Sequence, residues 1–114
     1  MSRRQPVGPE TTYTGTVPQP LDQMRLELDR TAVQQGWVVG PASTREQAVL
    51  VRGMSASSFG TTLYVQLVPD AAGTRLVFHP REAVPSLFDW GRNKRKVQRL
   101  LVALGGTLDG TRGA

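Results

Sequence analysis

Alternation of apolar and polar residues is the clearest pattern in the middle of the chain. In residues 61–69 apolar side chains occupy every second position, which is the period of a strand with one buried face. A turn that contains Gly73 leads to a second strand at 74–80. Pairing Val68 with Arg75 places five apolar residues on one side of this hairpin. They are Leu63, Val65, Leu67, Leu76 and Phe78.

Apolar residues spaced three and four apart predict two helices. The first spans residues 21–35, and Gly36 follows it as a left-handed C-terminal cap. The second is expected to begin at a cap provided by Ser86 or Asp89, to run to Leu104 and to end at Gly105-Gly106. Its apolar face consists of Val97, Leu100, Leu101 and Leu104.

Three shorter segments complete the predicted fold. Residues 11–17, which are rich in Thr and Tyr, and the Val-containing segments 37–40 and 47–54 are predicted as strands. The resulting order, β-α-β-β-β-β-α, predicts a single α+β domain whose helices cover one face of an antiparallel sheet, a TBP-like arrangement. We expect the domain to occupy residues 10–105, with a flexible N-terminal tail at 1–9 and a flexible C-terminal tail at 106–114.

Charge is distributed unevenly along the chain. Residues 1–91 carry eight basic and eight acidic side chains, so the whole net charge of +5 lies in residues 92–114. A helical wheel places four cations in a stripe on the side away from the apolar face. A polar side is needed by any helix that packs on a sheet, but this one has no acidic residue between positions 92 and 108. The stripe consists of Arg92, Arg95, Lys96 and Arg99 and predicts an anionic partner, either a nucleic acid or an acidic protein surface.

The side of the sheet opposite the helices offers a second candidate surface. It is expected to present Tyr64, Gln66, Arg75 and His79. Proteins that bind single strands stack bases on aromatic residues of such a surface and hold phosphates with cations. An ordinary solvent-exposed face or a homodimer surface fits the same residues.

The chemistry of the remaining residues favours no reaction. The chain has no cysteine and a single histidine, His79, and its acidic residues are scattered. We therefore expect no catalytic residues, metal site or cofactor, and no enzymatic activity. No run of eighteen apolar residues is present, and the first ten residues lack the apolar core of a signal peptide, so a cytoplasmic location is expected.

Two short motifs resemble a known group of proteins. Ser58-Phe59-Gly60, the hairpin at 61–80 and Asp89-Trp90-Gly91-Arg92-Asn93 are similar to a small uncharacterised family of bacterial α+β domains. Its helix opens with a D-W-G-R/K-N motif. The resemblance covers residues 58–104 and implies a folding motif, because no reaction or ligand comes with that family.

Three functions remain open from the sequence. The leading hypothesis is a binding module whose basic helix contacts a nucleic acid or an acidic protein. A carrier of a small apolar ligand, held between the helices and a curved sheet, is the second. The third is a structural domain that forms a homodimer through the open sheet face or through the strand at 11–17, expected at the sheet edge.

Overall fold

A computed structural model describes residues 11–53, 60–82 and 92–112 of the chain. Within these ranges the domain contains two helices, α1 (Leu21–Gln34) and α2 (Arg92–Ala103). The strands are β1 (Thr12–Val17), β2 (Val38–Val39), β3 (Gln47–Arg52), β4 (Thr61–Asp70), β5 (Gly73–Glu82) and β6 (Thr107–Arg112).

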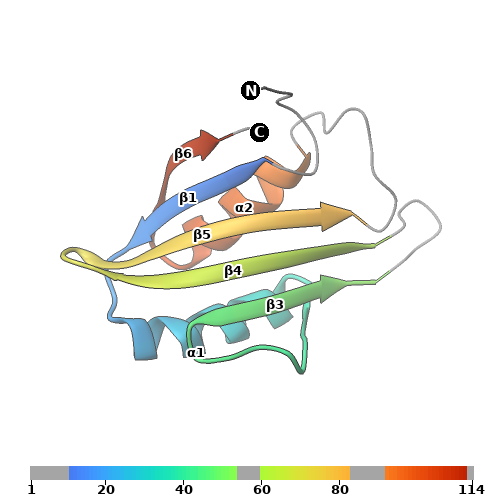
Figure 1. Ribbon diagram of the computed structural model, residues 1–114, viewed down its shortest axis with the longest axis horizontal. Helices are drawn as coiled ribbons and strands as arrows, with labels where there is room; N and C mark the ends of the chain where they lie inside the picture. The colour runs from blue at the N-terminus through green and yellow to red at the C-terminus, as the bar shows by residue number, and fades with distance from the viewer. Residues whose placement is uncertain (1–10, 54–59, 83–91, 113–114) are drawn as a thin grey trace, which may run out of the picture.

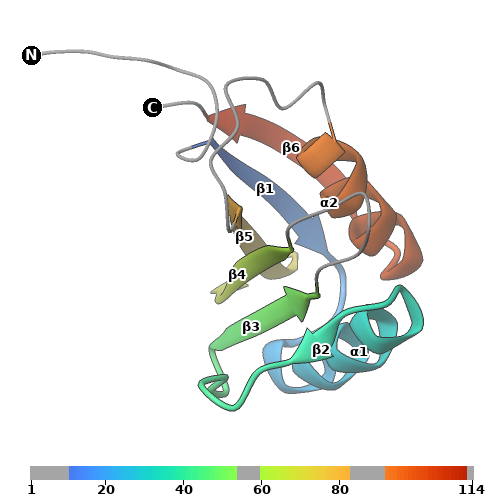
Figure 2. The same ribbon diagram turned by 90° about the vertical axis from the view of Figure 1, so that its right-hand side faces the viewer.

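The described strands form one antiparallel sheet, and both helices cover the same face of it. The strand order is β2-β3-β4-β5-β1-β6, and every neighbouring pair is antiparallel. Figure 1 looks onto the open face, with the helices behind the sheet, and Figure 2 shows α1 and α2 on one side of the curved sheet. The predicted α+β class, with helices on one face, is confirmed.

The central hairpin has the register that alternation predicts. Val68 pairs with Arg75, Leu67 with Leu76, and Val65 with Phe78. The two strands are joined by Ala71 and Ala72, and the following Gly73 has a φ of 141°. Side chains that point toward the helices are buried, while those on the other face are half-buried or exposed. The buried face of the hairpin is therefore set by its own pattern.

The hairpin is longer than predicted, because Pro80 does not end it. Strand β5 continues to Glu82, and Pro80 pairs with Leu63 of β4. On its other side β5 pairs with β1 only up to Phe78, which faces Tyr13. Pro80 thus lies beyond the end of the β1–β5 ladder. A proline is tolerated there, because β1 has no residue opposite it that would need its N–H as a donor.

Both helices end at a glycine in the left-handed region, as predicted. Gly36 has a φ of 92° and Gly105 a φ of 78°. The next residue in each case donates its N–H to a carbonyl five residues earlier: Trp37 to Ala32 at 2.9 Å and Gly106 to Leu101 at 2.8 Å. This pattern satisfies carbonyls that the helix end would leave unpaired.

The core lies between the helices and the sheet. Buried side chains from β1, β3, β4 and β5 meet the apolar faces of both helices. Phe78, Met24 and Leu28 are among the largest side chains that are fully buried. The other buried apolar residues are Tyr13, Val17, Leu21, Ala32, Trp37, Ala48, Leu50, Leu63, Val65, Leu67, Leu76, Val97, Leu100, Leu101 and Leu104.

The predicted C-terminal tail is wrong for residues 107–112, which form β6. This strand pairs with β1 from Thr12↔Arg112 to Thr16↔Thr107, with a register shift beside Asp109. Without β6, one side of β1 would expose its N–H and C=O groups, and pairing satisfies them. Strand β1 is therefore internal, and the prediction that residues 11–17 form an edge strand is also wrong.

Some predictions concern residues outside the described ranges. These are the N-terminal tail at 1–9, the caps Ser86 and Asp89, and most of the two motifs of the resemblance, including Trp90. Neither α1 nor α2, the helices of the described part, has the length and apolar composition needed to cross a membrane.

Candidate functional site

Burial of one face fixes the orientation of α2. Val97, Leu100 and Leu101 are fully buried, and the helix contacts β1 and β6. At Gly15 of β1 the contact is close: a Cβ atom added there would lie 2.6 Å from both Cδ atoms of Leu101. These three fully buried aliphatic side chains contribute roughly 1.5–3 kcal/mol each to such packing. The opposite face of α2 must then point to solvent.

The structure separates the predicted basic stripe. Arg95 and Arg99 are exposed, as expected, and Lys94 is exposed as well. Lys96 is half-buried, and its Nζ donates a hydrogen bond to Thr61 Oγ1 at 3.2 Å. Arg92 begins α2, and its side chain is outside the described part. At about 100° per residue, Arg95 and Arg99 lie about 40° apart around the helix, whereas Lys94 lies about 100° from Arg95. We call Arg95 and Arg99 the basic face.

The different position of Lys96 follows from helix geometry. At about 100° per residue, Lys96 lies about 40° from Leu100, which points into the core. Its long aliphatic stem can therefore follow the apolar surface while the ammonium group reaches the start of β4. A stripe defined only by its angle to the apolar face does not distinguish such a border position from the exposed centre.

Four arginines elsewhere in the described part of the domain form ion pairs with carboxylates, whereas the exposed cations of α2 do not. Arg25 pairs with Asp29, and Nε of Arg45 lies 2.6 Å from Oδ1 of Asp22. Arg30 pairs with Glu27, and Arg75 pairs with Asp70. Among the described residues, no carboxylate forms an ion pair with Lys94, Arg95 or Arg99. The positive charge of the basic face is therefore not neutralised by the described part of the domain.

Two cations of α2, Lys94 and Arg95, lie in the half of the helix whose dipole disfavours positive charge. The described helix begins at Arg92 and has no acidic residue in its first turn. Lys94 and Arg95 thus lie near the partial positive charge of a helix N-terminus, where cations are destabilising. An external anion beside Arg95 would relieve this repulsion.

The Asp22–Arg45 pair leads to a pH-dependent prediction. A hydrogen bond from Arg45, together with its charge, lowers the pKa of Asp22 below its ordinary value. The pair stabilises the fold above that ordinary pKa, and the contribution is lost as the pH falls through the lowered value. We expect the Asp22 carboxyl, followed by NMR, to titrate below the usual range, and Arg45→Ala to move the midpoint upward. Arg30→Ala is the control and should leave the titration midpoint of Asp22 unchanged. Equal Asp22 midpoints in the unchanged protein and in both variants would show that Arg45 does not pair with Asp22.

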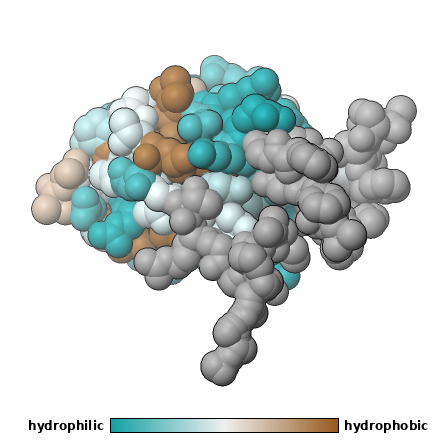
Figure 3. All heavy atoms as spheres, turned by 90° about the horizontal axis from the view of Figure 1, so that it is seen from above, coloured by the Kyte–Doolittle hydropathy of each residue, from teal (hydrophilic) through white to brown (hydrophobic). Residues whose placement is uncertain are grey.

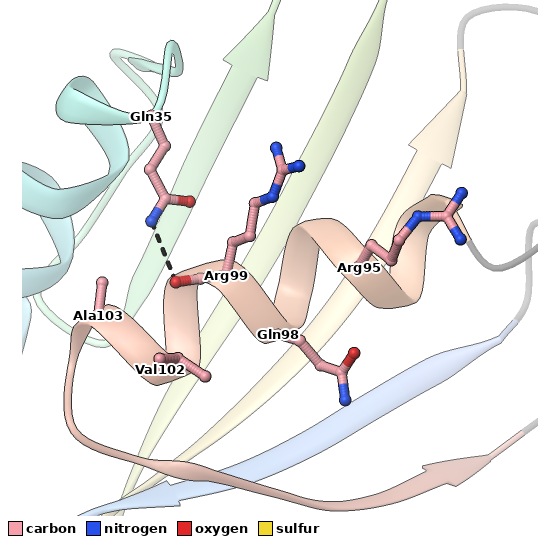
Figure 4. A pocket seen from close by; sticks show the side chains of 6 residues that line it. All are labelled: Gln35, Arg95, Gln98, Arg99, Val102 and Ala103. Atoms are coloured by element: carbon pink, nitrogen blue, oxygen red, sulfur yellow. Dashed lines mark hydrogen bonds between the residues drawn. The ribbon is translucent and has the colours of Figure 1, made fainter.

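A shallow hollow adjoins the basic face. It has a volume of about 560 Å³ and is lined by Gln35, Arg95, Gln98, Arg99, Val102 and Ala103 (Figure 4). Val102 is 73% exposed, the highest value among the exposed aliphatic side chains of the described residues, which also include Leu26, Val33 and Val38. Sequence reasoning missed Gln98 and Val102, although their spacing of three and seven residues from Arg95 places them on the same face.

Gln35 joins the hollow from the other helix. It follows the last residue of α1, and its Nε2 donates a hydrogen bond to the carbonyl of Arg99 at 3.0 Å. Its own carbonyl accepts a hydrogen bond from Arg52, whose guanidinium lies 5.1 Å from the ring centroid of Trp37. These contacts hold the end of α1 beside α2. No sequence signal predicts this, because the contact joins residues 64 positions apart.

The second candidate surface is assembled as predicted. Tyr64 and His79 are directly opposite each other in the β4–β5 ladder, and both are half-buried on the open face. Gln66 and Arg75 are exposed on the same face. Nη2 of Arg75, however, lies 3.7 Å from Oδ1 of Asp70. This surface thus has a single aromatic ring on its central strands and a cation already engaged in an ion pair.

The contact between α2 and the sheet bears on the carrier hypothesis. Such a carrier needs a cavity of roughly 300–1,000 Å³ between helices and sheet. At Gly15 the side chain of Leu101 fills this space, and Val17 closes against Gly106 in the same way.

No group of three or more acidic or histidine side chains converges as a metal site would, among the residues that the structure describes.

Comparisons with known proteins give no relative. The chain matches no protein-family model, no curated protein and no solved structure.

Proposed function

We propose that this protein is a binding module, not an enzyme, and that the basic face of α2 contacts the phosphates of a nucleic acid. The observation that carries the proposal is the difference between two sets of cations. Arg95 and Arg99 are exposed and have no carboxylate partner among the described residues, whereas Arg25, Arg30 and Arg45 each have one.

The arrangement favours phosphate over isolated carboxylates. Arg95 and Arg99 are one turn apart, about 6 Å along the helix axis, and lie on the same side. The fork of each guanidinium can donate two hydrogen bonds to one phosphate. A regular row of anions along a backbone matches two arginines repeated at one helical turn. An acidic protein surface is the competing partner, and the test below includes it.

Salt dependence of binding tests the proposal. A labelled single-stranded oligonucleotide, followed by fluorescence anisotropy, should bind with an affinity that falls linearly on a log–log plot against salt. With Arg95 and Arg99 on phosphates, we expect a slope of about −1.4, since each contact to a single strand adds about −0.7. Unlabelled polyglutamate should be a much weaker competitor than the unlabelled oligonucleotide. Binding that ignores salt, no binding at low salt, or equal competition by polyglutamate would contradict the proposal.

A further inference from the structure

The hollow beside the basic face is more apolar than a phosphate requires. Val102 and Ala103 lie at one end of it, at the C-terminal end of α2, Arg95 lies at the other end, and Arg99 lies between them beside Gln35 (Figure 4). Seen from the β6 side, the described surface also shows apolar areas next to a broad hydrophilic one (Figure 3). A phosphate is bound by cations and hydrogen-bond donors. Contact with phosphate therefore does not account for the exposed side chain of Val102.

The groups around the hollow are those that recognise an unstacked base. The flat guanidinium of an arginine stacks on a base, and an aliphatic side chain packs against its face or methyl group. The side-chain amides of Gln35 and Gln98 can each donate and accept hydrogen bonds at a base edge. Gln35 is held by its bond to the Arg99 carbonyl, so one of these amides has a fixed position.

A duplex would contact this surface through its phosphate backbone and not through its bases. The major groove of B-DNA is about 12 Å wide and accommodates one helix of about the same diameter. Helix α2 has the sheet behind it and the end of α1 beside it, joined through Gln35. It therefore does not project alone from the domain, and a duplex would offer the hollow only its backbone.

We infer that the hollow binds an unstacked base while Arg95 and Arg99 hold the adjoining phosphates, so that the partner is a single strand. This inference rests on the proposed function and goes beyond it, because phosphate contacts alone would not distinguish single strands from duplexes. The bases of a single strand are available without the cost of unpairing.

The test compares one oligonucleotide as a single strand and as a duplex, under the same salt conditions. We expect the single strand to bind at least ~10-fold more tightly, in line with the effect of one well-placed base contact. The double variant Gln98→Ala/Val102→Thr should remove most of this preference and leave duplex binding unchanged. Val33→Thr, at another exposed valine in α1, is the matched control and should change neither affinity.

The outcomes separate the inference from the function on which it rests. If the duplex binds as tightly as the single strand, or if the double variant keeps the full preference, the inference is wrong while the basic face can still bind phosphates. If neither oligonucleotide binds, both are wrong. Circular dichroism of each variant shows whether the fold is retained, and exposed positions such as Gln98 and Val102 should retain it.

Discussion

Gly15→Val should destabilise the domain by about 1–3 kcal/mol or more, because β1 has no room for a side chain where α2 packs on it. The added Cβ would lie 2.6 Å from two Leu101 carbon atoms and 2.9 Å from the carbonyl oxygen of Thr107. Leu101 is fully buried and Thr107 contributes backbone, so neither can move without disturbing the core or the β1–β6 ladder. Denaturant unfolding followed by circular dichroism measures the change.

Gly110 provides the matched control for this substitution. It lies in β6 opposite Thr14, one residue from Gly15 along the ladder, and an added Cβ would meet nothing within 4 Å. Gly110→Val should therefore be neutral or stabilising, because a β-branched residue suits a strand better than glycine. Equal effects of the two substitutions would show that α2 does not approach β1 closely at Gly15.

Local patterns were sufficient for the parts of the fold that are determined locally. Alternation in residues 61–69 and 74–80 predicted the hairpin register, because a slip by one residue would expose its whole apolar face. Gly36 and Gly105 marked the helix ends, since each takes a backbone conformation that other residues disfavour. Apolar spacing in α2 correctly placed Arg95 and Arg99 in solvent.

What the sequence could not predict depends on distant contacts. Strand β6 is polar apart from Leu108 and forms because β1 offers it backbone partners from the other end of the chain. The hydrogen bond from Gln35 to the Arg99 carbonyl likewise depends on how the two helices meet. Lys96 was misplaced because its position at the border of the apolar face is decided by the contact with Thr61.

Charge reversal of Arg95 and Arg99 should have the largest effect on function. Each hydrogen bond to a charged group contributes about 1.5–3 kcal/mol, so losing two should weaken oligonucleotide binding by about 100-fold or more. The variant Arg95→Glu/Arg99→Glu also places two negative charges against the phosphates. Because both side chains are exposed, the fold should be retained.

A second double variant removes the same total charge from elsewhere. Arg30→Glu/Arg45→Glu changes two exposed arginines of the paired set, at 65% and 61% side-chain exposure. Any loss of affinity that reflects only net charge should appear equally in both double variants. A specific basic face predicts a small loss in this control and a large one in Arg95→Glu/Arg99→Glu.

The most direct measurement is therefore the affinity of the two double variants for the same labelled single strand at one salt concentration. The proposed function predicts a loss of about 100-fold or more in Arg95→Glu/Arg99→Glu, at least ten times the loss in Arg30→Glu/Arg45→Glu. Equal losses in both variants, or unchanged binding in Arg95→Glu/Arg99→Glu, would contradict the assignment of the basic face of α2 as the binding site.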